Sequence, residues 1–279
     1  LQWARFNRAH HDLAVVPDGD IYVLTRGARL APEVDRDSPI LEDFISILDP
    51  DGVEKRRISL LEVFESSAEQ HSWRRASRDF WSKEAIRGLV RQGGHGDLFH
   101  TNALEVLDGR PPLPGFEAGH LLLSFRNLDR IAVIDPESEQ VMWSLDARTS
   151  MQHDPSVTPE GGVLVFDNHW RPGERSRVVL LDPRDGSVMW QYHGPDEAPL
   201  YSETCGSAVR LANGNVLITE SDNGHALEVT GEGEVVWDFY NPQVAGKNAE
   251  FIATLFDLVR LPPDFPVDWA QGAADGLGE

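Results

Sequence analysis

The sequence is poor in cysteine, in positive charge and in long apolar runs, and each shortage argues against a class of protein. Its 279 residues contain one cysteine, Cys205, so no disulfide forms within the chain. The 25 Lys and Arg stand against 46 Asp and Glu, and the formal net charge of −21 argues against a nucleic-acid partner, which would need a basic surface. No stretch approaches the roughly 18 apolar residues of a transmembrane helix, so no membrane span is predicted.

Helical periodicity is also scarce. Only residues 59–90 have apolar spacing that fits helices, and we expect a partly helical insertion there, on the rim of the fold and reaching residue 96. Elsewhere, short apolar runs alternate with Gly, Pro and Asp turns, which is typical of an all-β protein. The first residues, LQWARFNRAHHD, show no basic-then-apolar signal pattern, and the cellular location is left open.

The turns recur at regular intervals. DPESEQVMW, DPRDGSVMW and VTGEGEVVW end in Trp143, Trp190 and Trp237, at steps of 47 residues. A second unit, HDLAVVPDGDI, HDPSVTPEGGV and GSAVRLANGNV, aligns without a gap, and a further copy starts at His100. Repeats of this length with four strands each are the signature of β-propeller blades.

We therefore predict a β-propeller of four-stranded antiparallel blades, forming a single domain over residues 1–279. Six blades are expected, with five as the alternative count, and residues 243–279 would be a closing segment. The opening LQWARF is interpreted as the outermost strand of a blade, and the repeated tryptophans as packing between blades. Oligomeric state is left open.

Three of these repeats begin with histidine, where the chain enters the innermost strand. His11 and His153 align, His100 holds the same place in its own copy, and each has a polar neighbour: Asp12, Asp154 or Asn102. Such residues could make only structural hydrogen bonds between strands and loops. Alternatively, the three imidazoles converge on one axial site, which could bind a divalent metal or hold an anion and pass protons to it. No other cofactor is expected.

Several stretches resemble one known family. DLFHTNALEVL, QHD, VLVFDN, SRVVLLDP and SAVRLANGNVLITESDNGHALEVTGEGEVVWDFYNP are similar to the arylsulfotransferase superfamily of β-propellers, above all to its uncharacterised bacterial members, over residues 10–26 and about 97–242. The resemblance implies six blades. It also implies transfer of a sulfuryl group from an aryl sulfate to a phenol, through a sulfated histidine and without a nucleotide donor, and suggests a periplasmic or secreted location.

Residue roles carry over in part. The resemblance implies catalytic roles for His100, His153 and Arg171, where imidazolium and guanidinium donors would stabilise the charge on the sulfuryl oxygens. The expected substrate-binding residues are His11, Asn102, Asn168 and His169. The nucleophilic histidine is expected near LYSETCGSAVRL, where the chain has Cys205 and no histidine. The alternative is a non-catalytic or metal-binding propeller that holds a small anionic ligand or a partner in the same pocket.

Overall fold

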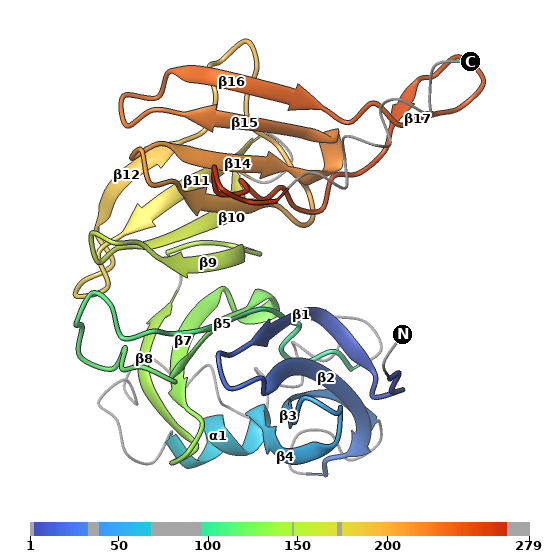
Figure 1. The fold of residues 1–279 in the computed structure, drawn as a ribbon, viewed down its shortest axis with the longest axis vertical. Helices are drawn as coiled ribbons and strands as arrows, with labels where there is room; N and C mark the ends of the chain where they lie inside the picture. Colours follow the sequence, from blue (N-terminus) through green and yellow to red (C-terminus); the bar gives the residue numbers. More distant parts are fainter. Residues whose placement is uncertain (1–2, 33–38, 68–95, 147, 172–174, 267–279) are drawn as a thin grey trace.

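Four antiparallel sheets follow one another around an open arc in the computed structural model, which describes residues 3–32, 39–67, 96–146, 148–171 and 175–266 (Figure 1). Each sheet has four strands that pair in chain order. Blade 1 contains β1 (Ala9–Val15), β2 (Ile21–Leu30), β3 (Pro39–Leu48) and β4 (Glu54–Ser59). Blade 2 contains β5 (Thr101–Val106), β6 (Leu121–Phe125), β7 (Arg130–Asp135) and β8 (Gln140–Asp146).

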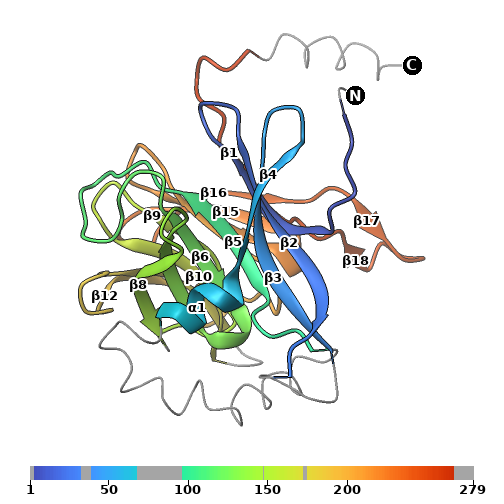
Figure 2. The same cartoon turned by 90° about the horizontal axis from the view of Figure 1, so that it is seen from below.

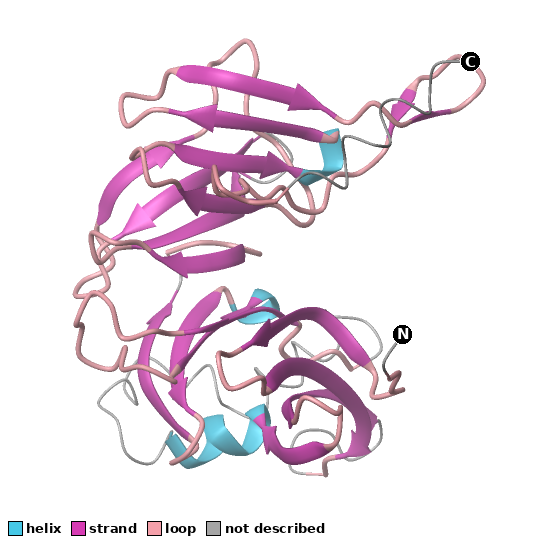
Figure 3. Ribbon diagram, viewed as in Figure 1, coloured by secondary structure: helices cyan, strands magenta, loops and turns pink. Residues whose placement is uncertain are grey.

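The other two blades repeat this plan. Blade 3 contains β9 (His153–Val157), β10 (Val163–Arg171), β11 (Arg175–Leu181) and β12 (Val188–Tyr192). Blade 4 contains β13 (Ser207–Arg210), β14 (Val216–Glu220), β15 (His225–Val229) and β16 (Val235–Tyr240). Among the described residues, helix is confined to α1 (Leu60–Ser67) and to two single 3-10 turns, η1 (Arg126–Leu128) and η2 (Ser221–Asn223) (Figure 3). The all-β propeller architecture is therefore confirmed.

Polar side chains join the innermost strands β1, β5, β9 and β13, each of which contacts the next. Asp12 on β1 accepts a hydrogen bond from the Leu104 backbone N–H of β5 (2.7 Å). Asp154 on β9 does the same for Ala208 of β13 (3.2 Å), and the Asn102 side-chain amide donates to the Gln152 carbonyl (2.9 Å). The acidic residue that follows His11 and His153 thus links its blade to the next one, as the structural interpretation of these pairs predicts.

The repeated tryptophans make a second link between blades. The indole N–H of Trp143 donates to the Pro183 carbonyl in the β11–β12 turn (2.7 Å), and that of Trp190 donates to Gly231 in the β15–β16 turn (2.9 Å). Trp3 makes the same contact with Pro50 in the β3–β4 turn (2.9 Å). Packing between blades is confirmed for Trp143 and Trp190, whereas residues 3–8 form no strand, so the interpretation of LQWARF as an outermost strand stays a prediction.

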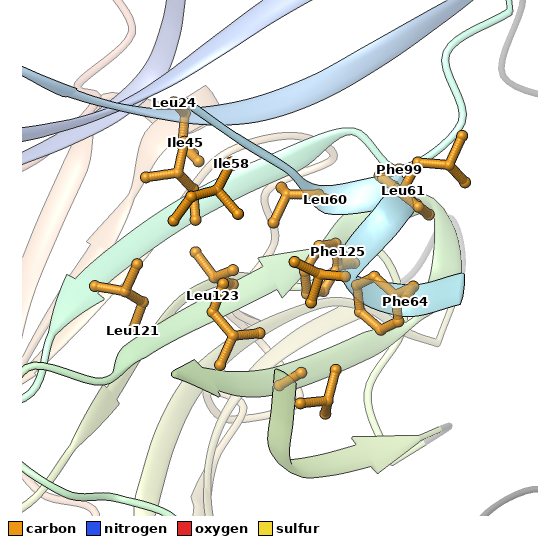
Figure 4. Close-up of a cluster of buried hydrophobic side chains, with 14 of the residues drawn as sticks. Leu24, Ile45, Ile58, Leu60, Leu61, Phe64, Phe99, Leu121, Leu123 and Phe125 are labelled. Atoms are coloured by element: carbon orange, nitrogen blue, oxygen red, sulfur yellow. The ribbon is translucent and has the colours of Figure 1, made fainter. Parts of the chain in front are cut away.

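The largest hydrophobic cluster lies between blades 1 and 2, and α1 belongs to it (Figure 4). Leu60, Leu61 and Phe64 of α1 are fully buried, and the Phe64 ring meets Phe125 edge to face with centroids 4.8 Å apart. The predicted helix is present at 60–67, next to the outermost strands β4 and β8, and the rim placement of the whole insertion stays a prediction. An apolar helix face must be covered, and here it fills the gap between two blades. Residues 68–95 of the predicted insertion lie outside the described residues.

The chain continues past blade 4 through a short hairpin, β17 (Val244–Ala245) with β18 (Phe251–Ile252), which projects away from the sheets (Figures 1 and 2). It then returns to blade 4, where Asp257 accepts a hydrogen bond from Ser207 (2.8 Å) and Arg260 pairs with Glu228 (2.6 Å). The described residues contain four complete blades, so the count of five or six, the single domain and the closing role of 243–279 stay predictions. In the part of the chain that is described, no helix has the length and apolarity needed to cross a membrane.

Candidate functional site

Unusual backbone geometry marks the entrance of each innermost strand. His11, His100 and Cys205 have positive φ angles of 56°, 49° and 57°, and in blade 3 the residue after His153, Asp154, has φ of 50°. The pairing register of β1, β5 and β9 shifts at these points. A bulge of this kind turns a side chain away from the sheet, and left-handed non-glycine residues gather at functional sites. The entrances therefore direct polar side chains toward one end of the blades.

Blades 1 and 2 bring two predicted histidines into contact. The rings of His11 and His100 meet edge to face, with centroids 4.8 Å apart. His10, which the sequence analysis missed, joins them through an Nδ1–Nδ1 hydrogen bond to His11 (2.8 Å). We call His10, His11, His100, His153 and Arg126 the axial cluster.

A network of charges supports His100 from behind. Its Nδ1 lies 2.6 Å from a carboxylate oxygen of Asp97, which also accepts the His100 backbone N–H (3.2 Å). Arg26 bridges Asp97 (3.4 Å) and the fully buried Asp43 (3.0 Å). Burial raises the pKa of Asp97, but the hydrogen bond from His100 and the charge of Arg26 outweigh it and bring that pKa below its usual value. Asp97 is therefore ionised at neutral pH, and His100 holds its proton on Nδ1 and leaves Nε2 for a substrate.

His153 has a neutral partner instead. Its Nδ1 lies 2.8 Å from the side-chain oxygen of Asn168, which is fully buried. The Asn168 amide nitrogen donates to the carbonyls of Ser202 (3.0 Å) and Cys205 (2.5 Å), which fixes the amide so that its oxygen faces the ring. His153 must then donate from Nδ1 to Asn168, and the Met151 backbone makes a further hydrogen bond with the ring.

The surroundings keep two of the histidines uncharged. Burial lowers the pKa of His153 to about 4; the Asn168 hydrogen bond opposes this shift, and the charge of Arg126 and the proximity of His100 add to it. Desolvation, and then repulsion between His11 and the neighbouring His100 and His10 rings when protonated, lower the pKa of His11 to about 3, although His11 is exposed at the inner edge of β1. At pH 7 both rings are therefore neutral, which suits His153 to accept a proton.

Arg126 in η1 is the positive charge of the cluster, and the sequence analysis missed it. Burial lowers the pKa of this guanidinium, while the nearby carboxylates of Asp97, Asp129 and Glu203, and Cys205 in its thiolate form, raise it. An arginine stays charged at neutral pH despite such a shift. A half-buried cation beside His153, between blade 2 and the loop that leads into blade 4, is suited to hold an anion.

The remaining predicted residues lie around the cluster. Arg171 stands exposed at the end of β10, with its guanidinium over the Trp170 ring, 4.6 Å from the centroid. His169 lies 3.5 Å from Glu203, and Asn102 is buried and bonded to the Gln152 carbonyl. The structure thus groups His11, His100 and His153, with Asn168 behind His153, whereas the contact of Arg171 is with Trp170. The roles of all these residues stay predictions.

Cys205 occupies the entrance of blade 4, where the nucleophilic histidine is expected. Burial raises the pKa of its thiol, so it is protonated at neutral pH. Among the described residues, no three His, Cys, Asp or Glu side chains are arranged to hold a metal ion.

Comparison with known proteins gives one family. The model of the family described as Arylsulfotransferase (ASST) matches residues 7–242. No curated protein matches this chain.

Similar solved structures include selenomethionine-substituted virginiamycin B lyase from Staphylococcus aureus, at 12% identity over 88% of this chain and 58% of that one, with a TM-score of 0.45. The Dos1 propeller is 12% identical over 84% of this chain and 48% of that one, with a TM-score of 0.46. Kuenenia stuttgartiensis hydrazine synthase is 14% identical over 80% of this chain and 52% of that one, with a TM-score of 0.42. The chain thus spans about half of the length of these structures.

Proposed function

Because the chain belongs to the arylsulfotransferase family, we propose that it transfers a sulfuryl group from an aryl sulfate to a phenolic acceptor at the axial cluster. One observation carries the proposal. His100 and His153 are each fixed at Nδ1, by Asp97 and Asn168, so both offer Nε2 to a substrate. Arg126 adds the positive charge that the sulfuryl oxygens need.

The first step uses His100. Its Nε2 lone pair attacks the sulfur while the bond from sulfur to the aryl oxygen breaks, and the phenolate leaves and takes a proton from water. The ring then carries the sulfuryl group on Nε2 and a positive charge, which the ionised Asp97 at Nδ1 offsets. His100 suits this step better than His153 because only His100 has a carboxylate behind it.

The second step uses His153. Its neutral Nε2 takes the proton of the acceptor phenol while the phenol oxygen attacks the sulfur and the bond from sulfur to the His100 nitrogen breaks. With a pKa of about 4, His153 is free to accept that proton at neutral pH. The guanidinium of Arg126 holds the sulfuryl oxygens in both steps.

Nitrophenol release tests the proposal. Wild-type protein incubated with 4-nitrophenyl sulfate and a panel of phenols should release nitrophenol, and the peptide that contains His100 should gain the mass of one sulfuryl group after rapid quenching. Replacing His100 or Arg126 by alanine should lower the rate by about a hundredfold or more. His120→Ala is the matched control, because His120 bonds to the Gly115 carbonyl in the turn before β6.

A second candidate function rests on Cys205, which stands where the nucleophilic histidine of the family is expected. The protein would then bind a small anion in the same cluster without transferring it. No nitrophenol release across the acceptor panel, together with anion binding that Arg126→Ala abolishes, would favour this candidate over the transferase.

A further inference from the structure

A separate cavity opens between blades 3 and 4. It has a volume of 570 Å³, within the range of pockets that hold small organic molecules. Its wall combines apolar side chains with two phenol rings, Tyr192 and Tyr240, and none of the described residues that line it is Lys or Arg. No member of the axial cluster lines it, so it is a second site.

A carboxylate and an imidazole are oriented in this wall. Glu220, only 5% exposed, accepts hydrogen bonds from the Tyr201 backbone N–H and the Asn223 amide (both 2.7 Å) and from Nδ1 of His225 (2.8 Å). Because the carboxylate can only accept, Nδ1 of His225 donates the hydrogen bond to Glu220. The ring stacks on Tyr240 with centroids 4.2 Å apart and an angle of 11°, which fixes its orientation.

We propose that this cavity binds an organic cation, an ammonium group carried on an apolar body. The Glu220 and Asp238 carboxylates in the wall favour positive charge, and an aromatic ring such as that of Tyr192, which also lines the cavity, attracts cations. The net charge of −21 adds attraction at long range.

Apolar neighbours complete the site. Leu200, Leu227 and Ile252 line the cavity and would cover the body of such a ligand. An aryl sulfate, as an anion, is the wrong substrate for this wall. The inference therefore does not depend on sulfuryl transfer.

Three ligands that differ only in the head group test the charge preference. Phenethylamine and 2-phenylethanol share a phenyl ring on a two-carbon arm, and in phenylacetate the second carbon is the carboxylate. Calorimetry at low salt measures the affinity of the full chain for each of the three. The amine should bind about tenfold more tightly than the alcohol, a difference of about 1.4 kcal/mol, and phenylacetate should bind most weakly. Equal affinity for the three, or no amine binding at millimolar concentration, overturns the proposal.

Two substitutions place the binding in this cavity. Asp238→Asn should weaken amine binding about fivefold and leave the alcohol unchanged, whereas Asp51→Asn, with the same charge change in the exposed β3–β4 turn, should alter both by less than about twofold. Ala198→Lys puts a positive charge at an exposed position of the wall and should reverse the order of amine and phenylacetate. Equal effects of the two Asp substitutions, or an unchanged order in Ala198→Lys, would place the amine elsewhere and refute the site.

Discussion

Blades 2 and 3 begin alike and differ in what stands behind their first histidine. His100 bonds to the ionised Asp97, and His153 bonds to the amide of Asn168. Both innermost strands also carry a carboxylate that accepts a backbone N–H from the next blade, Glu105 five residues after His100 and Asp154 directly after His153. The comparison teaches that a histidine at the same repeat position differs in its chemistry because the group bonded to its Nδ1 differs. Both blades nevertheless use a carboxylate to bind the next blade.

Exchanging the partner of His100 should have the largest effect. Asp97→Asn leaves an amide beside Nδ1, as in blade 3, and removes the charge that offsets a sulfated ring. Sulfuryl transfer from 4-nitrophenyl sulfate should fall by about a hundredfold in kcat/KM. If the rate is unchanged, His100 does not carry the sulfuryl group.

Removing the partner of His153 should mainly lower stability. Asn168→Leu takes the donor from the Ser202 and Cys205 carbonyls and the acceptor from His153, and should cost about 2 kcal/mol of unfolding free energy. Urea denaturation measures the change. Ser66→Ala is the control, because among the described residues its hydroxyl bonds to the Val63 carbonyl of α1 and to Gln140 at the surface.

The two matching carboxylates should give both blades the same pH response. Burial raises the pKa of Glu105 and of Asp154 to about 7, because each carboxyl is desolvated and the one backbone hydrogen bond it receives does not compensate. Between the unfolded pKa, near 4, and pH 7 the folded form holds a proton that the unfolded form has lost, so stability is greatest at low pH and falls as pH rises to 7.

Glu105→Gln and Asp154→Asn should therefore each raise the unfolding free energy at pH 7.5 by about 1 kcal/mol and flatten its decline between pH 5 and 7. Urea denaturation at a series of pH values measures both. A response in only one variant would show that the two links differ, contrary to the comparison.

The smallest effects should come from the tryptophans at the ends of the two blades. Trp143→Phe and Trp190→Phe keep the ring packing but lose the bonds to Pro183 and Gly231. Each should lower stability by about 1 kcal/mol, seen as a few degrees in Tm. Trp237→Phe is the comparison, since the Trp237 ring is 39% exposed and lies beside Arg260.

The repeat pattern predicted the blades because each repeat carries the same turn residues and the same apolar alternation. It also located His100 and His153, which stand at fixed repeat positions. Arg126 was missed because it belongs to a 3-10 turn whose counterpart in blade 4 is Ser221, a residue with no charge to compare. Aligning FRNLD with ESDNG, which end in Asp129 and Gly224 with positive φ, would have shown that Arg126 stands at a repeated turn position.

Other features depend on three-dimensional placement. The apolar face of Leu60, Leu61 and Phe64 predicted that α1 must be covered, but no periodicity says which neighbour covers it. The pairing of His100 with Asp97 was legible in the DLFH motif, three residues apart, whereas its link through Arg26 to Asp43 joins residues far apart in the chain. The family spacing placed Arg171 with His153, yet β10 runs on beyond the entrance and carries Arg171 out over Trp170.

The indole contacts give the arc a mechanical property. Each of the Trp3, Trp143 and Trp190 indoles donates a hydrogen bond to a carbonyl in a turn of the following sheet. If the chain were stretched from its ends, these indole contacts would be loaded one after another. Each contact would then break before the next one carried the force. Damage to one turn should then spread no further than the two sheets that share it, as in other proteins built from stacked repeats.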